Sequence, residues 1–141
     1  MTKQQKIEKV FNELNSENME LLYTFYDQFV LFEDPVGTHK GIDAVRKYYE
    51  NLYKNVESIK FDFSNHVCDS NQCVSMWTMH LKAKNLNGGE PIAVIGNSFI
   101  KFDKDGKVIY HRDYFDMGEF IYERIPILKN IIKFIKNKLK E

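Results

Sequence analysis

Two aspartates and one histidine lie where they could carry out acid–base chemistry. Glu33 and Asp34 precede Pro35 at the end of an apolar, aromatic run, and His111 and Asp113 lie two residues apart in KVIYHRDYFD. Side chains two residues apart on a β-strand share one face, so His111 and Asp113 would point the same way. An imidazole beside a carboxylate exchanges protons near neutral pH. We therefore take Asp34, Asp113 and His111 as candidate catalytic residues for proton transfer.

The surroundings of Asp34 decide between two roles. A carboxyl group that faces an apolar pocket loses hydration, which makes it a stronger base. An Asp directly before a proline can instead bond to backbone amides and hold a turn. Both interpretations stay open for Asp34.

Other kinds of chemistry find little support in the sequence. The chain has 2 Cys and 4 His, none at a spacing typical of a zinc site, and it has no Gly-rich phosphate loop. We expect no metal and no cofactor. Cys68 and Cys73 flank DSNQ, which resembles a hairpin turn that would place them opposite each other. Because no secretion signal is visible, we expect two reduced thiols rather than a disulfide.

The elements that position these residues follow from hydrophobic periodicity and turn signals. Residues 3–15 and 16–27 have helical patterns, the second opening with an N-cap at Ser16, and FVLFED is a short strand that ends at Pro35. A loop begins at Gly37, and a third helix runs from residue 42 to about 55. Four strands then alternate with the turns DSNQ, NLNGGE and DKDG. This order predicts an α+β fold with helices on one face of a sheet.

Length and charge limit the possible partners. The 141 residues suit a single domain, 1–141, and 20 basic and 20 acidic residues cancel, so bulk charge does not favour nucleic acid. No run of 18 apolar residues is present, and MTKQQKIEKV lacks the apolar segment of a signal peptide. We expect a cytoplasmic protein. Aromatic residues make up 14% of the chain, which suits an apolar ligand cavity, a dense core or a dimer interface.

The order of elements, EDPVG after the second helix and GKVIYHRDYFD in the last strand resemble one protein family. They are similar to the ketosteroid isomerase and SnoaL-like branch of the nuclear-transport-factor-2-like superfamily, over residues 7–117. The resemblance implies a cone-shaped fold, with a strongly curved mixed or antiparallel sheet, helices on its concave side and a C-terminal helix. It also implies an apolar cavity and a homodimer.

The resemblance suggests roles for individual residues. Asp34 matches the proton-shuttling base of the isomerases, and Asp113 matches an acid–base Asp of SnoaL-like cyclases. Val10 and Ser98 stand where the isomerases have their two oxyanion donors, while Tyr26 and Tyr49 match supporting tyrosines. The expected ligand-binding residues are Val10, Tyr26, Tyr49, Met76, Thr78, His80, Ser98 and Phe115.

The same alignment directs Met76, Thr78 and His80 inward. It sends the apolar trio Trp77, Met79 and Leu81 to the opposite face of the sheet, where they would need to be covered. A homodimer through this trio is the resulting prediction.

Residues 117–141 form a C-terminal helical extension. Isoleucines and leucines from Ile127 to Leu139 recur at helical spacing opposite several lysines. Such a stripe can lie on an anionic membrane. We expect it to pack on its own protein instead, without membrane contact.

The favoured function is a cofactor-independent acid–base enzyme. It would act on a small hydrophobic molecule, of steroid, polyketide or terpenoid type, by isomerisation, cyclisation, dehydration or epoxide opening. The alternative is a non-catalytic module of the same fold that binds a small hydrophobic ligand or another protein. The missing oxyanion donors favour that alternative.

Overall fold

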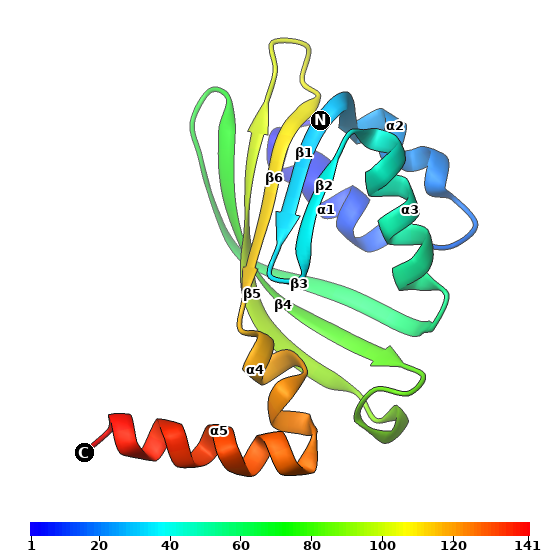
Figure 1. Cartoon of the computed structure of the whole chain (residues 1–141). Coiled ribbons are helices and arrows are strands. Elements are labelled where there is room, and N and C mark those ends of the chain that lie inside the picture. Colours follow the sequence, from blue (N-terminus) through cyan, green and yellow to red (C-terminus); the bar gives the residue numbers. More distant parts are fainter.

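The computed structural model describes all 141 residues (Figure 1). The N-terminal helices are α1 (Lys3–Glu13), η1 (Met19–Leu21) and α2 (Leu22–Phe25). The hairpin β1 (Tyr26–Asp34) and β2 (Gly37–Lys40) and the helix α3 (Ile42–Tyr53) follow. Then come β3 (Val56–Cys68), β4 (Gln72–Ala83), η2 (Asn87–Gly89), β5 (Ile92–Phe102) and β6 (Val108–Phe115). The chain ends with α4 (Met117–Phe120), η3 (Tyr122–Arg124) and α5 (Pro126–Leu139).

One mixed sheet organises the molecule. Its strand order is β2-β1-β6-β5-β4-β3, with β1 and β6 parallel and all other neighbours antiparallel. The long strands bend strongly, and α1 and α3 lie on the concave side (Figure 1). The predicted α+β cone fold and its four-stranded meander are confirmed. Since β6 pairs with β1, the sheet brings Asp113 and Asp34 to neighbouring strands.

Gly96 allows the sheet to hold a large ring at its bend. Trp77 and Gly96 are directly paired across β4 and β5. A Cβ atom on Gly96 would lie 2.5 Å from the Trp77 ring and 2.7 Å from the Tyr114 carbonyl oxygen, far inside van der Waals contact. Only glycine permits this approach. The indole ring of Trp77 therefore packs directly against the strand beside it.

Two local predictions near the N-terminus are wrong. Residues 16–27 do not form one helix with Ser16 as N-cap: they form a turn, η1 and α2, and β1 begins already at Tyr26. Aromatic and β-branched residues from Tyr26 onward favour a strand, and pairing with β6 decides the competition. The segment predicted as a loop from Gly37 is strand β2, which pairs with β1 across a two-residue turn at Pro35 and Val36.

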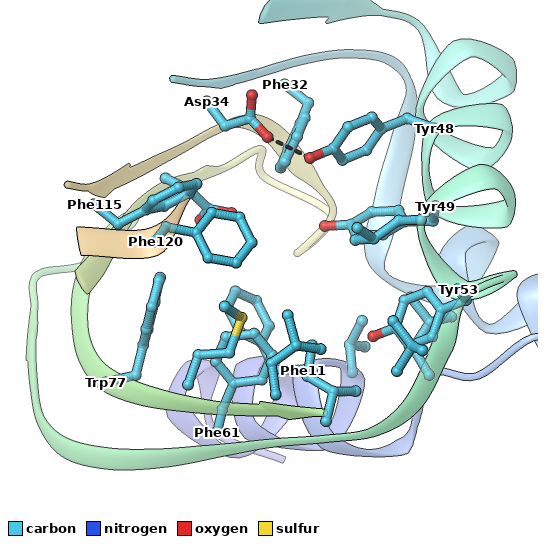
Figure 2. A pocket seen from close by; sticks show the side chains of 18 of the residues that line it. Phe11, Phe32, Asp34, Tyr48, Tyr49, Tyr53, Phe61, Trp77, Phe115 and Phe120 are labelled. Atoms are coloured by element: carbon cyan, nitrogen blue, oxygen red, sulfur yellow. Dashed lines mark hydrogen bonds between the residues drawn. The ribbon is translucent and has the colours of Figure 1, made fainter. Parts of the chain in front are cut away.

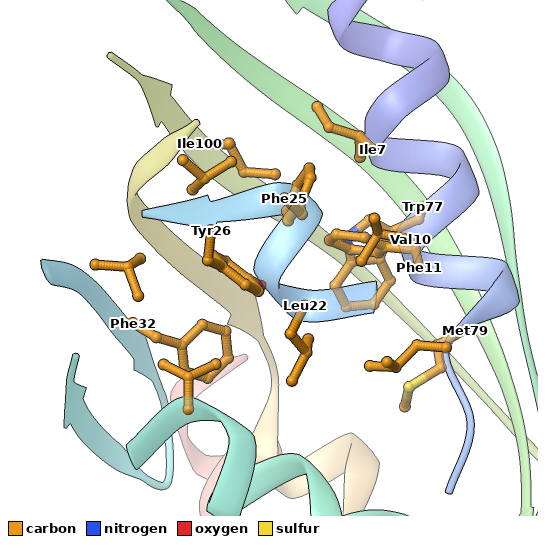
Figure 3. Packing of buried hydrophobic residues seen from close by; sticks show 14 of the residues in the cluster. Ile7, Val10, Phe11, Leu22, Phe25, Tyr26, Phe32, Trp77, Met79 and Ile100 are labelled. Atoms are coloured by element: carbon orange, nitrogen blue, oxygen red, sulfur yellow. The ribbon is translucent and has the colours of Figure 1, made fainter. Parts of the chain in front are cut away.

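The core lies between α1, α2 and the concave face of the sheet (Figure 3). Ile7, Val10 and Phe11 come from α1, and Leu22 and Phe25 come from α2. All five are buried. The predicted stripe of the first helix is confirmed, and its N-terminus is fixed by a capping box between Thr2 and Gln5. The helices thus close one side of the cone.

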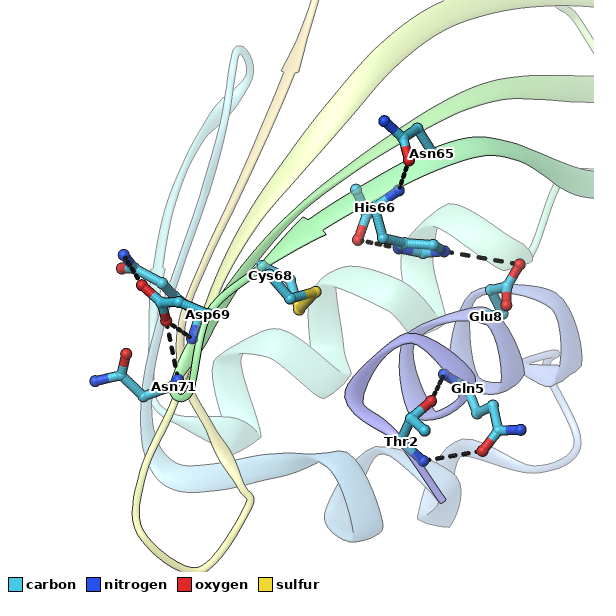
Figure 4. The surroundings of a disulfide bond; sticks show 11 residues. Thr2, Gln5, Glu8, Asn65, His66, Cys68, Asp69 and Asn71 are labelled. Carbon is cyan, nitrogen blue, oxygen red and sulfur yellow. Dashed lines mark hydrogen bonds and ion pairs between the residues drawn. A yellow bond between two sulfur atoms is a disulfide. The ribbon is translucent and has the colours of Figure 1, made fainter.

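The two cysteines form a disulfide, so the prediction of reduced thiols is wrong (Figure 4). The hairpin part of the prediction is confirmed: Cys68 and Cys73 are paired residues of β3 and β4, with Cα atoms 4.1 Å apart. Asp69 holds the turn between them by accepting bonds from the amides of Asn71 and Gln72. Register, rather than cellular compartment, decides whether two thiols can meet.

The predicted docking of the C-terminal helix on the body is wrong. α5 contacts the adjoining η3 turn and extends away from the sheet (Figure 1). None of its residues is buried. No helix in the chain combines the length and apolar character needed to cross a membrane.

Candidate active site in the cone

An apolar cavity of about 80 Å³ opens inside the bent sheet (Figure 2). Of its 19 lining residues, 17 are hydrophobic, and the remaining two are Asp34 and Asp113. A carboxylate in such surroundings has few competing polar partners. The two carboxylates singled out from the sequence therefore share one cavity.

Asp34 is both a turn residue and a cavity residue. Its Oδ1 accepts hydrogen bonds from the amides of Val36 (2.9 Å) and Gly37 (3.0 Å), which fix the β1–β2 turn. Its Oδ2 accepts a short bond from the Tyr48 hydroxyl, drawn in Figure 2. Burial and this carboxylate raise the pKa of Tyr48 above its ordinary value, so the phenol keeps its proton and donates. Both oxygens of Asp34 are thus engaged.

Asp113 is held through only one of its oxygens. Oδ1 lies 2.6 Å from His111 Nε2 and accepts a second bond from the Ser98 hydroxyl. Ser98 in turn accepts from Trp77 Nε1 at 2.9 Å. Because an ionised carboxylate only accepts hydrogen bonds, His111 Nε2 carries a hydrogen. Oδ2 accepts no hydrogen bond from the protein, and Asp113 lines the cavity.

Behind Asp113, a chain of buried hydroxyls supports the imidazole. His111 is fully buried, and its Nδ1 lies 2.6 Å from the Tyr26 hydroxyl. Tyr26 lies 3.3 Å from the Tyr49 hydroxyl. Burial raises the pKa of both tyrosines above its ordinary value, so both remain neutral donors. With a neutral imidazole, every donor points along the chain from Tyr49 toward Asp113.

Helix α3 supplies three tyrosine hydroxyls to the cavity wall. Tyr48, Tyr49 and Tyr53 all line the cavity from this helix, and Figure 2 shows their hydroxyls on its inner side. Tyr48 and Tyr49 are engaged with Asp34 and Tyr26. The Tyr53 hydroxyl makes no hydrogen bond to the protein, and burial raises the pKa of Tyr53 to about 12. It is a neutral donor without a protein acceptor.

Half of the expected ligand-binding residues reach the cavity. Val10, Tyr26, Tyr49 and Phe115 line it. Ser98 is fully buried and supports Asp113 rather than facing the cavity.

The strand-face assignment of β4 is wrong. Trp77, Met79 and Leu81 are buried and line the cavity, while Met76 and His80 are exposed on the other face. Thr78 lies with them, and His80 pairs with Asp62 at 2.9 Å. Alternation fixed the two sets, but the larger apolar side chains occupy the concave face, where α1 covers them. The argument for a dimer through Trp77 falls with this assignment.

A bulge in β6 explains why both Val108 and His111 face the core. The β5–β6 register shifts between Lys101 and Phe102, which pair with Tyr110 and Val108. Val108 and His111 are therefore both buried, although they are three positions apart and would point to opposite faces of a regular strand, and Ile109 is exposed.

Several cavity residues carried no individual signal in the sequence. Tyr48 and Tyr53 lie in YYENLY, which reads as an ordinary helix. Tyr53 lies four positions after Tyr49, and this spacing puts both on one helix face, which could have marked Tyr53 as a cavity residue beside the expected Tyr49. Phe120 reaches the cavity from α4 and packs edge-on against Phe115, with ring centroids 5.4 Å apart.

The comparisons with known proteins agree with this fold. A search of curated proteins found no match. An NTF2-like protein of unknown function from Burkholderia pseudomallei K96243 superimposes with a TM-score of 0.72, at 16% identity, covering 86% of this chain and 98% of that one. A candidate SnoaL-like polyketide cyclase from Shewanella putrefaciens CN-32 gives 0.72 at 20% identity, covering 84% and 93%.

A third structure has the ketosteroid isomerase-like fold and contains trimethylamine. It comes from Catenulispora acidiphila DSM 44928 and gives a TM-score of 0.71 at 12% identity, covering 84% of this chain and 88% of that one. At these identities the likeness establishes the fold. The family model of the SnoaL-like domain matches residues 7–111, and the chain therefore belongs to the SnoaL-like domain family.

Proposed function

We propose that the protein is a cofactor-independent acid–base enzyme that moves a proton between carbons of a small apolar carbonyl compound. The observation that carries the proposal is the asymmetry of Asp113. His111 and Ser98 hold Oδ1, Oδ2 has no protein donor, and Asp113 lines the apolar cavity. A carboxylate oriented in this way is placed to accept a proton from carbon.

The remaining groups divide the work. Asp113 takes a proton from the carbon beside the carbonyl of an unsaturated ketone. The C–H electron pair forms a C=C bond, and the π electrons of the C=O bond move to the oxygen, which gives a dienolate. Tyr53 donates a hydrogen bond to that oxygen, because its hydroxyl has no other acceptor. Asp113 then returns the proton to a different carbon. Asp34 already accepts three hydrogen bonds, from Tyr48 and two turn amides, so we assign it the support of the cavity mouth.

The cavity limits the substrate. Its volume of about 80 Å³ is well below the ~300–1,000 Å³ of pockets for drug-sized ligands. A small ring or the reactive end of a larger molecule fits this space. A steroid- or polyketide-sized substrate requires that Phe115 and Phe120, which form one wall, move apart.

Deuterium exchange tests the proposal without knowledge of the natural substrate. A cyclic enone such as cyclohexenone in D₂O is incubated with the protein, and loss of its exchangeable C–H signals is followed by proton NMR. We expect exchange above the buffer rate, and a fall of about 10²–10⁴-fold in Asp113→Asn. Asp62→Asn, which removes an exposed carboxylate outside the cavity, is the control. Equal exchange by wild type and Asp113→Asn would refute the assignment.

A binding module is the second candidate, and the bonding of Asp34 favours it. This carboxylate matches the base of the isomerases, yet its bonds to two amides and to Tyr48 suit a structural role. Native mass spectrometry of the purified protein distinguishes the two candidates. A retained apolar ligand, together with no proton exchange on any enone, would support binding over catalysis.

A further inference from the structure

Helix α5 carries a large apolar face that nothing in the chain covers. The exposed fractions are 75% for Ile127, 63% for Phe134 and 81% for Leu139, and Ile131 and Ile135 are each half exposed. The helix extends away from the sheet and leaves this face open (Figure 1). Exposed apolar surface of this extent marks an interaction site.

The opposite face of α5 is basic. Residues 126–141 contain five lysines and one acid, so the segment has a charge of 5 − 1 = +4 in a chain whose net charge is zero. Lys136 is paired with Glu123 at 2.6 Å, and Lys138 lies 3.9 Å from Glu141. Lys129, Lys133 and Lys140 form no ion pair. Three free cations thus stand beside the apolar face.

The geometry of the helix places the two faces side by side. At 100° per residue, the apolar positions from Ile127 to Leu139 span less than half of the circumference, and Lys129, Lys133, Lys136 and Lys140 cluster on the rest. Lys138 falls at the apolar face, where its ammonium group lies over the Phe134 ring. Its long apolar stem can lie along this face while the ammonium group reaches water. Fourteen residues make a helix of about 21 Å, which suits a position in the plane of an interface.

We propose that α5 docks on the surface of a membrane that contains anionic lipid. Such a surface offers an apolar acyl layer and negative headgroups next to each other, which match the two faces of the helix. A second copy of α5 would match the apolar face only, because it would bring another +4 segment against the first. Charge complementarity therefore favours the lipid surface over self-association.

Vesicle sedimentation with the full chain tests the proposal. We expect binding to phosphatidylcholine vesicles that contain phosphatidylserine, and at least tenfold weaker binding to phosphatidylcholine alone. Raising the salt concentration should weaken the binding, since it screens the lysines from the headgroups. Lys129→Gln with Lys133→Gln should weaken it as well.

A charge-matched pair of variants isolates the apolar face. Ile131→Glu adds one negative charge to the apolar face, and Asn130→Glu adds the same charge to the polar face. We expect Ile131→Glu to abolish vesicle binding and Asn130→Glu to reduce it only by the effect of one charge. Both side chains are exposed, so the fold should persist, which circular dichroism checks.

Two results would overturn the proposal. One is equal vesicle binding by Ile131→Glu and Asn130→Glu. The other is a dimer in light scattering that Ile131→Glu dissociates, with no binding to anionic vesicles at low salt, which would make a second copy the occupant of this face.

Discussion

His111 Nε2 lies 2.6 Å from Asp113 Oδ1, and the two residues share the inner face of β6. The imidazole is fully buried and packs edge-on against Phe32, with ring centroids 4.7 Å apart. It therefore has little freedom to turn away from the carboxylate. The pair holds the Asp113 carboxylate in one orientation, and the proposed proton transfer requires a base that is held in place.

Ser98 should act as a positioning residue for Asp113. Ser98→Ala removes one of the two donors to Oδ1 and leaves Trp77 Nε1 without its acceptor. We expect kcat for enone exchange to fall about tenfold with KM unchanged, because the substrate does not touch Ser98. Steady-state kinetics measure the split, and Ser98→Thr, which keeps the hydroxyl, should restore the rate. A rise in KM alone would indicate a role in binding.

The buried tyrosines should make the fold sensitive to alkaline pH. Burial raises the pKa of Tyr26, Tyr48, Tyr49 and Tyr53, so the folded protein keeps phenolic protons that the unfolded chain loses near pH ~10. Above that pH the unfolded state binds fewer protons, and the free energy of unfolding falls as pH rises. Below it, the contribution is fully present.

Tyr53 should affect stability over a defined range of pH. Its pKa of about 12 means that it lowers stability between pH ~10 and about 12. Tyr53→Phe should reduce the slope of stability against pH there by up to ~1.4 kcal/mol per pH unit. Urea denaturation at a series of pH values provides the slope, and Tyr122→Phe, at an exposed site, is the control. An unchanged slope in Tyr53→Phe would contradict the assignment.

The sequence predicted the sheet because turns and alternation are local signals. DSNQ and DKDG mark chain reversals that the structure retains, and Asp113 and His111 share a face as expected. Alternation cannot tell which face of a strand points inward, and this is where β4 was misassigned. Trp77 lies inward because Gly96 makes room for it on the neighbouring strand, a relationship between residues 19 positions apart.

The missed parts of the site depend on contacts across the fold. Tyr48 donates to Asp34 from a different element, and Tyr53 faces the cavity because α3 crosses the open side of the sheet. The exposed position of α5 also depends on the path of the chain through the fold. Its stripe predicts an amphipathic helix, but only the path of the chain after β6 decides whether the body lies within reach.

The Cys68–Cys73 disulfide should stabilise the fold modestly. It links residues separated by only five positions, so the loop-entropy argument gives about 2 kcal/mol as an upper value, and the hairpin already pairs the two residues. Denaturation of wild type with and without reducing agent measures the difference. Enone exchange should not change on reduction, since neither cysteine lines the cavity. A loss of exchange on reduction would show that the hairpin tip and the site are coupled.

The contact between Trp77 and Gly96 gives the sharpest test of the site's architecture. Gly96→Ala places a methyl group against the indole ring and the Tyr114 carbonyl, and overpacking of this kind costs about 1–3 kcal/mol. Gly37→Ala is the matched control, because nothing lies within 4 Å of its Cβ position, and it should change stability by less than ~0.5 kcal/mol.

Gly96→Ala should also slow the proposed proton exchange. Trp77 donates to Ser98, which donates to Asp113, so displacement of the indole ring loosens the carboxylate. We expect Gly96→Ala to shift the fluorescence of Trp77, the only tryptophan in the chain, and to slow enone exchange, while Gly37→Ala does neither. If Gly96→Ala moves the tryptophan signal but leaves the exchange rate intact, the bond chain from Trp77 to Asp113 does not position the base.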